Sequence, residues 1–244
     1  MDNKRHLKKF ENQATYESQK NTLMKSPYVV YLEDTQEVVY VNKTYEFVDL
    51  GLPSGTLWST KNIGAESEED FGLYFAWGSV EGATKEGVES GEYTFGTDGN
   101  MMSHVDPSAQ TWTKYNTVDG KIVLDLEDDA AYVNMGEDWH MPTQEQCSEL
   151  ITFTNQVRES VNGVNGFRFT SKSNSNASIF IPNAGTANFD GDILNVNNMF
   201  NVLSNSKGTM GSESNYVLYS TTDSLINVGL HPRIGGCSVR GVKG

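Results

Sequence analysis

Short apolar or aromatic runs separated by glycine make up most of this sequence, and they constrain its fold more than any other feature. Phe47–Leu50 and Thr56–Ser59 have the composition of strands on either side of a Leu52–Gly55 turn, and Tyr74–Gly78 has that of a buried run. Only 37% of the residues are apolar, which suits a loop-rich fold better than a helical bundle. We therefore expect an α+β domain over residues 46–244 with much of its surface in loops.

One long helix is predicted over Gln144–Val161. Thr143 is a good N-cap, and Gln146 three residues later completes a capping box. A shorter helix is expected over Leu124–Tyr132, and a single helical turn over residues 66–72. The buried face of the long helix should consist of Cys147, Leu150, Ile151, Thr154, Val157 and Val161.

Further strands are predicted between polar connections rich in asparagine and glycine. Residues 79–124, 183–205 and 206–215 are expected to be surface loops. The candidate strands are Phe167–Thr170, Ser178–Ile181, Tyr216–Thr221 and Ser238–Val242.

The first 45 residues differ in character from the rest of the chain. Asp2–Met24 predicts a charged helix with Ala14 on its apolar face, and Tyr28–Leu32 with Glu37–Val41 predicts a β-hairpin. A helix and a hairpin are too small to bury a core alone, so we expect an anchor or oligomer interface here. The alternative is a hairpin that extends the sheet of the main domain. The predicted interface residues are Leu7, Phe10, Tyr28, Val30, Leu32 and Val39.

Acidic residues are concentrated in one stretch of the chain. The net charge is −14, and residues 46–154 alone carry 21 acidic side chains against four Lys or Arg. Because such a field repels phosphates and anionic lipids, we expect no nucleic-acid partner and no membrane insertion. Met1–Lys9 is polar and no apolar core of signal length follows, which favours assembly in a cytoplasm over secretion.

Catalysis finds little support among the residues. The Gly-x-Ser-x-Gly elbow of serine hydrolases is missing, and His104, His140 and His231 have no partner that the spacing identifies. Cys147 falls on the apolar face of the predicted helix, where an inert thiol is expected. We therefore predict that the chain is not an enzyme.

Binding is better supported, because several aromatic and amide side chains fall in predicted loops. Trp112 and Tyr115 are expected to be the exposed rings. The predicted ligand-binding residues are Trp112, Tyr115, Asp190, Asp192, Asn195 and Tyr219.

Two acidic groups raise the question of calcium. One is the loop Asp190–Asn195, and the other comprises Asp125, Glu127, Asp128 and Asp129. Neither follows the EF-hand pattern, so we expect these acids to cap turns and helix ends and predict no metal or other cofactor, with calcium as the alternative.

Six phrases recur in an order typical of one family. They resemble the Fibrobacter succinogenes major paralogous domain, which implies a C-type-lectin-like fold with a mixed sheet, neighbouring termini and loops grouped for binding. The resemblance also implies that Trp58, Trp77 and Trp139 lie in the core. Because that family is distantly related to the formylglycine-generating enzyme fold, it offers as an alternative an oxidase that uses Cys147 and Cys237. The sequence departs from that family at His140, Gly241 and Tyr219–Thr222. The phrases are Phe47–Trp58, Asn62–Ala65, Gly72–Gly78, Leu124–Ala131, Trp139–Thr143 and Gly235–Arg240.

The N-terminal segment carries a second resemblance. Phe10–Glu17 and Ser26–Tyr40 are similar to the opening of structural proteins from crAss-like phages of Bacteroides. This resemblance implies a virion protein, a head or tail fibre or capsid decoration, in which residues 1–45 bind other virion proteins. We expect a homo-oligomer, a dimer or trimer, that adheres to a host surface glycan or protein. The alternative is a secreted carbohydrate-binding module of a Bacteroidetes bacterium.

Overall fold

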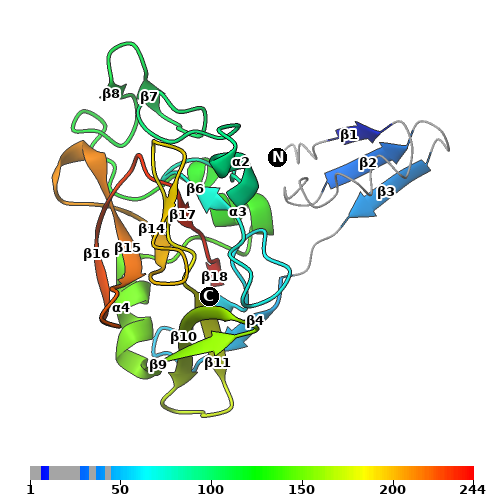
Figure 1. The fold of residues 1–244 in the computed structure, drawn as a ribbon, viewed down its shortest axis with the longest axis vertical. Coiled ribbons are helices and arrows are strands. Elements are labelled where there is room, and N and C mark those ends of the chain that lie inside the picture. Colours follow the sequence, from blue (N-terminus) through cyan, green and yellow to red (C-terminus); the bar gives the residue numbers. More distant parts are fainter. Residues whose placement is uncertain (1–6, 11–27, 33–36, 42–44) are drawn as a thin grey trace.

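The computed structural model describes residues 7–10, 28–32, 37–41 and 45–244 (Figure 1). The chain has a mixed α+β fold with 13% helix and 34% strand, so sheets dominate its architecture. The predicted α+β class is therefore confirmed.

The largest sheet has the strand order β16-β15-β14-β17-β6. Its members are β6 (Tyr74–Phe75), β14 (Asn201–Lys207), β15 (Ser214–Ser220), β16 (Ile226–Pro232) and β17 (Cys237–Ser238). All neighbours are antiparallel except β14 and β17, which run parallel.

Strand β14 was predicted as a loop, and the structure corrects this. Its sequence is mostly polar, yet Ser204 and Asn205 are buried in the sheet. The Ser204 hydroxyl donates to the Tyr216 carbonyl at 2.8 Å, so the polar group is satisfied inside the protein. Because the buried polar residues Ser204 and Asn205 directly follow the core residues Val202 and Leu203, the usual alternation of apolar residues is missing from the sequence.

A second sheet, β11-β10-β9, packs beside helix α4 (Gln144–Phe153). It consists of β9 (Thr154–Val161), β10 (Val164–Ser171) and β11 (Ser178–Pro182). The capping box at Thr143 and Gln146 is confirmed, with both side chains bonded to the reciprocal backbone groups.

The C-terminal half of the predicted long helix is wrong, because residues 154–161 form β9. Thr154 has extended backbone, and its hydroxyl donates to the Leu150 carbonyl at 2.5 Å, which satisfies a helix-end acceptor. Asn162 and Gly163 then have φ of 48° and 86°, as a two-residue hairpin turn requires. Val157, predicted to be buried, is 57% exposed on this strand.

A third sheet joins the two ends of residues 46–244. Strand β5 (Leu57–Ser59) lies between β4 (Phe47–Asp49) and β18 (Val242–Lys243).

Residues 66–72, predicted as a helical turn, form turns and no helix. The remaining elements are α2 (Lys85–Glu89), β7 (Val105–Asp106), β8 (Thr111–Trp112), η1 (Leu126–Asp128), α3 (Ala130–Met135), β12 (Thr186–Ala187), β13 (Ile193–Leu194) and η2 (Gly211–Glu213).

Buried aromatic residues fill the core between these sheets. Trp58, Trp77 and Trp139 are buried, as predicted. A fully buried arginine, Arg240, crosses the core and donates to Asn62 Oδ1 at 3.0 Å and to the Phe180 carbonyl at 2.7 Å. These bonds offset part of the cost of burying a guanidinium group.

The N-terminal strands form a separate three-stranded sheet, β1-β2-β3, which lies to one side of the rest in Figure 1. The predicted hairpin is confirmed as β2 (Tyr28–Leu32) and β3 (Glu37–Val41), with Val30 opposite Val39. The helix predicted over Asp2–Met24 is wrong at β1 (Leu7–Phe10), which pairs parallel with β2. An isolated charged helix is marginal in water, whereas this short run gains hydrogen bonds along an apolar strand. Ala14 lies outside the described residues.

Candidate functional site

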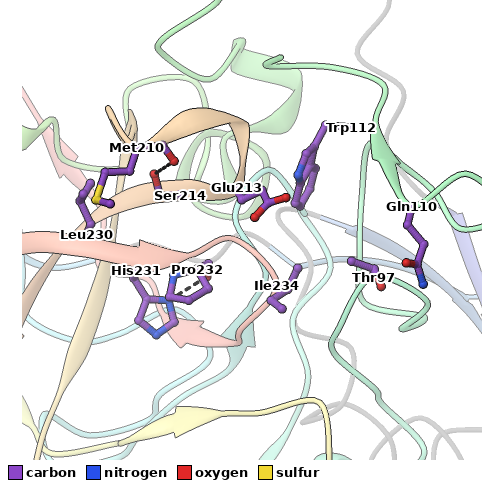
Figure 2. Close-up of a pocket in the computed structure, with 10 residues that line it drawn as sticks. All are labelled: Thr97, Gln110, Trp112, Met210, Glu213, Ser214, Leu230, His231, Pro232 and Ile234. Atoms are coloured by element: carbon purple, nitrogen blue, oxygen red, sulfur yellow. Dashed lines mark hydrogen bonds between the residues drawn. The ribbon is translucent and has the colours of Figure 1, made fainter. Parts of the chain in front are cut away.

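A groove of about 480 Å³ opens beside Trp112 and is called the Trp112 groove below (Figure 2). It forms where the loop around β7 and β8 meets the η2 segment and the end of β16. Its lining combines apolar and polar side chains: Thr97, Gln110, Trp112, Met210, Glu213, Ser214, Leu230, His231, Pro232 and Ile234.

The indole of Trp112 is held in place by a buried arginine. The Arg233 guanidinium carbon lies 3.6 Å from the centre of the Trp112 ring and 4.6 Å from that of Trp77. Arg233 Nη1 also donates to the Tyr115 carbonyl at 3.2 Å, and Asn116 Nδ2 donates to the Trp112 carbonyl at 2.8 Å. Trp112 is therefore a fixed wall of the groove rather than a freely rotating surface ring.

The segment that carries Trp112 contains unusual backbone conformations. His104, Gln110 and Tyr115 have φ of 60°, 51° and 58°. Within residues 45–244, the remaining non-glycine residues with positive φ are Ser224 and three asparagines, which tolerate this region better. Each such residue costs on the order of 1–3 kcal/mol, and such costs are found preferentially at functional sites.

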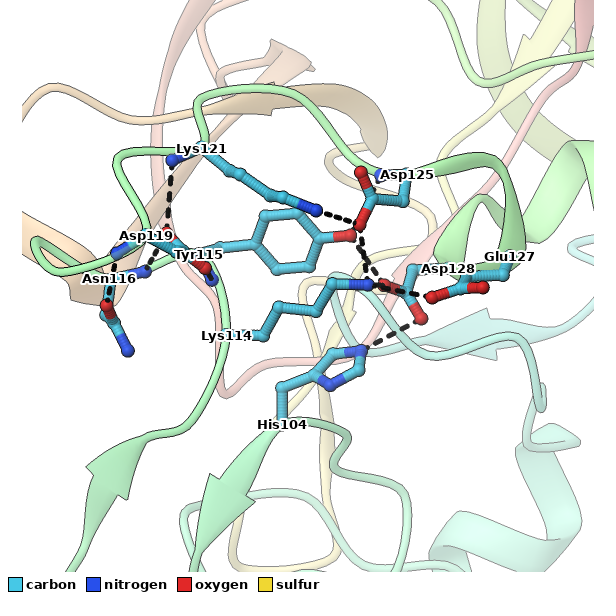
Figure 3. A network of polar contacts seen from close by, with 9 residues as sticks. All are labelled: His104, Lys114, Tyr115, Asn116, Asp119, Lys121, Asp125, Glu127 and Asp128. Carbon is cyan, nitrogen blue, oxygen red and sulfur yellow. Dashed lines mark hydrogen bonds and ion pairs between the residues drawn. The ribbon is translucent and has the colours of Figure 1, made fainter.

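A polar network secures this strained segment (Figure 3). Lys114 Nζ lies 2.7 Å from Asp125, 3.1 Å from Glu127 and 2.5 Å from Asp128. The second oxygen of Asp128 lies 2.9 Å from His104 Nε2. Although burial raises the pKa of Asp128, hydrogen bonds from Lys114 and its other neighbours bring that pKa below its usual value.

This network bears on the calcium alternative. Asp125, Glu127 and Asp128 each offer an oxygen within 4.8 Å of the others, which is close enough to share a cation. The Lys114 ammonium already occupies that position. Asp129, the fourth acid of the group, instead caps α3 by accepting from Ala131 N at 2.9 Å.

Tyr115 was predicted to be an exposed ring, and the structure corrects this. It is fully buried, and its hydroxyl donates to Asp128 Oδ2 at 2.5 Å while accepting from Asp125 N at 2.8 Å. Burial and the bond to Asp128 raise the pKa of the phenol above its ordinary value. Tyr115 supports the loop and presents no ring to a ligand.

The other predicted binding residues lie outside the Trp112 groove. Tyr219 is half-buried against the core. Asp190, Asp192 and Asn195 are exposed, and the backbone N–H groups of both aspartates donate to Asn188 Oδ1 at 3.0 and 2.9 Å. Asn188 therefore makes the Asx turn that stabilises this loop, in place of the capping predicted for its acids.

Sequence reasoning missed most of the groove. Gln110, Met210 and Glu213 stand in segments without a motif, and Leu230 and His231 belong to β16, a strand that was not predicted. Their convergence depends on the pairing of β16 with β15, which no local sequence signal reveals.

The groove contains serine, histidine and glutamate, the residue types of a hydrolytic triad, but they do not form one. Ser214 Oγ donates to the Met210 carbonyl at 3.1 Å, and His231 Nδ1 lies 2.8 Å from the Pro232 carbonyl. A nucleophile must hydrogen-bond to its base, and these two described side chains bond elsewhere.

His231 also lies close to Cys237. Its sulfur lies 3.7 Å from both ring nitrogens, so neither nitrogen is aimed at it as a base would be. Burial raises the pKa of Cys237 to about 12 and lowers that of His231, and both groups are neutral at pH 7. Cys147 is also a free, buried thiol whose pKa burial raises, and it packs in a different core cluster from Cys237.

Comparison of the chain with family models, with curated proteins and with solved structures found no match. Among the residues that the structure describes, no helix has the length and hydrophobicity needed to cross a membrane.

Proposed function

We propose that this chain is a phage virion structural protein that displays a C-type-lectin-like domain for adhesion to a host surface glycan or protein. The observation that carries the proposal is the Trp112 groove, in which a fixed indole is presented on a strained loop. Rigid aromatic rings beside adaptable polar groups are typical of recognition surfaces. The proposed place of the protein in the virion is a head or tail fibre or a capsid decoration.

The architecture of residues 46–244 supports this role. Lys243 pairs with Leu57, so the chain enters and leaves the domain at neighbouring strands. In Figure 1 the connection around β7 and β8, which carries Trp112, lies at the top of the domain, away from β4 and β18. Such a domain can be held at one end while its loops meet a partner.

The N-terminal sheet supports attachment and self-association through residues 1–45. The strand sequences Tyr-Val-Val-Tyr-Leu and Glu-Val-Val-Tyr-Val are apolar at almost every position, so successive residues place apolar groups on both faces of the sheet. Apolar side chains on both faces of β2 and β3 need cover, and we propose that other chains provide it, either copies of this protein or neighbouring virion proteins.

The test is deletion of residues 1–45 in the infecting phage. We expect the truncated protein to fold, to be monomeric by light scattering and to be missing from purified particles. The control is full-length Trp112→Ala, which should join particles at the normal copy number. Normal incorporation of the truncated protein would contradict the proposal.

A further inference from the structure

We propose that the Trp112 groove binds one uncharged sugar unit of a glycan, with the apolar face of the sugar ring stacked on the indole. This inference rests on the proposed function and deepens it by naming the ligand class and the residues that select it.

The lining of the groove suits a ligand with one apolar face and a polar rim. Trp112 and Ile234 form one apolar wall, and Met210, whose side chain is 74% exposed, forms another with Leu230. Figure 2 shows Gln110 and Thr97 on one side of the indole and Glu213 on the other. A sugar ring matches this arrangement, because its C–H groups pack on an aromatic face while its hydroxyls reach amide, hydroxyl and carboxylate groups.

The buried arginine behind the indole disfavours a cationic ligand. Arg233 stacks at 3.6 Å on Trp112 and so already uses the attraction of that ring for a positive charge. Burial lowers the pKa of Arg233 to about 10, which leaves it charged at neutral pH. A lysine or arginine side chain placed on the opposite face of the same ring would be repelled by it.

An anionic sugar is disfavoured by the rest of the groove. None of its ten lining residues is a lysine or arginine, and Glu213 supplies a carboxylate at the rim. His231 cannot compensate, because burial lowers its pKa and keeps the ring neutral. The groove therefore selects against both signs of charge, which leaves neutral sugars.

The groove is also prepared for binding before the ligand arrives. Asn116 and Arg233 fix Trp112, and the Lys114 network fixes the loop on which it stands. Because these groups are ordered by the protein itself, a ligand loses little free energy in organising the site.

The experiment is a fluorescence and NMR titration of the full-length protein with neutral glucose, galactose and mannose oligosaccharides, their uronic-acid counterparts and glucosamine oligosaccharides. We expect at least one neutral series to bind, with the uronic acids and the amino sugars at least tenfold weaker. Trp112→Ala should weaken binding at least tenfold. Phe189→Ala, which removes an aromatic side chain that is 64% exposed and does not line the groove, should leave it unchanged.

A second variant keeps the test valid if loss of Trp112 disturbs the fold. Glu213 is exposed, so Glu213→Lys should fold normally and shift preference towards uronic acids at least tenfold. The inference is wrong if no neutral sugar binds, if a basic peptide binds more tightly than every sugar, or if neither variant alters sugar binding. Particle incorporation is measured separately, so failure of sugar binding with normal incorporation rejects this inference alone.

Discussion

Replacement of Lys114 by methionine tests whether this lysine is the internal cation of the acidic cluster. The variant keeps the unbranched stem of the side chain, removes the ammonium group and leaves Asp125, Glu127 and Asp128 facing one another. The main cost comes from Asp128, which is buried and loses an ammonium donor at 2.5 Å. Loss of a hydrogen bond between charged groups in a buried setting costs about 1.5–3 kcal/mol. For a domain of this size, that corresponds to a fall in Tm of roughly 5–10 °C.

Urea and thermal unfolding followed by tryptophan fluorescence would measure this change. Lys121→Met is the matched control, because Lys121 also contacts Asp125 at 2.5 Å but is 43% exposed. An exposed ion pair contributes little, so this control should unfold like the original protein. Equal stability of Lys114→Met and the unsubstituted protein would refute the assigned role.

Calcium binding to the Lys114→Met variant provides a second test of whether Lys114 occupies the cation position. Removal of the lysine leaves three carboxylates around a vacant cation position, and a weak site with a Kd of about 1 mM is expected there. At about 10 mM calcium, such a site would restore roughly 1.4 kcal/mol to the variant. The unsubstituted protein should show no such gain, and an equal gain would show that Lys114 does not occupy the cation position.

Three further predictions follow from other buried groups. Asp129→Ala should lower the free energy of unfolding in urea by about 2–4 kcal/mol, because the variant loses the N-cap of α3 and the acceptor of the buried Met141 N–H, which lies 2.9 Å from Asp129 Oδ2. Asp129→Asn should lower it by less than half as much. Burial lowers the pKa of His231 in the folded state below its ordinary 6.5, so the unfolded chain binds more protons just below that pH. The free energy of unfolding should therefore fall as the pH drops from 7 to 5, and His231→Gln should make that dependence on pH weaker. An unchanged pH dependence in the variant would count against the buried, neutral state of the ring. Neither Cys147 nor Cys237 should react with a thiol reagent at pH 8 until urea unfolds the chain, and rapid reaction of the native protein would contradict their burial.

The sequence predicted the features that depend on local signals. The capping box at Thr143 identified the start of α4, and the motifs of the family resemblance identified the core positions of Trp58, Trp77 and Trp139. The end of α4 was missed because Val157 and Val161 continue the helical spacing by chance. The hairpin signal Asn162-Gly163 was the stronger local cue, since its positive φ values fix the turn.

The candidate site was predicted only in part, because it depends on contacts between distant segments. Trp112 was identified from its residue type and its place in a loop. Tyr115, three residues later, was assigned the wrong environment because its burial depends on Asp128 and Arg233, which lie elsewhere in the chain. Strand β16 supplies part of the groove, and its membership of the sheet follows from pairing with β15 rather than from its own composition.

The pairing of β4, β5 and β18 brings the first and last strands of residues 46–244 side by side. Because the first and last strands of this region both pair with β5, a host polypeptide could receive the domain in an exposed turn with little distortion of its own backbone. The same geometry would allow another N-terminal segment to replace the sheet β1-β2-β3 while the Trp112 groove stays intact. Under the proposed function, recombination at the segment before β4 would therefore exchange the attachment segment and the binding groove independently.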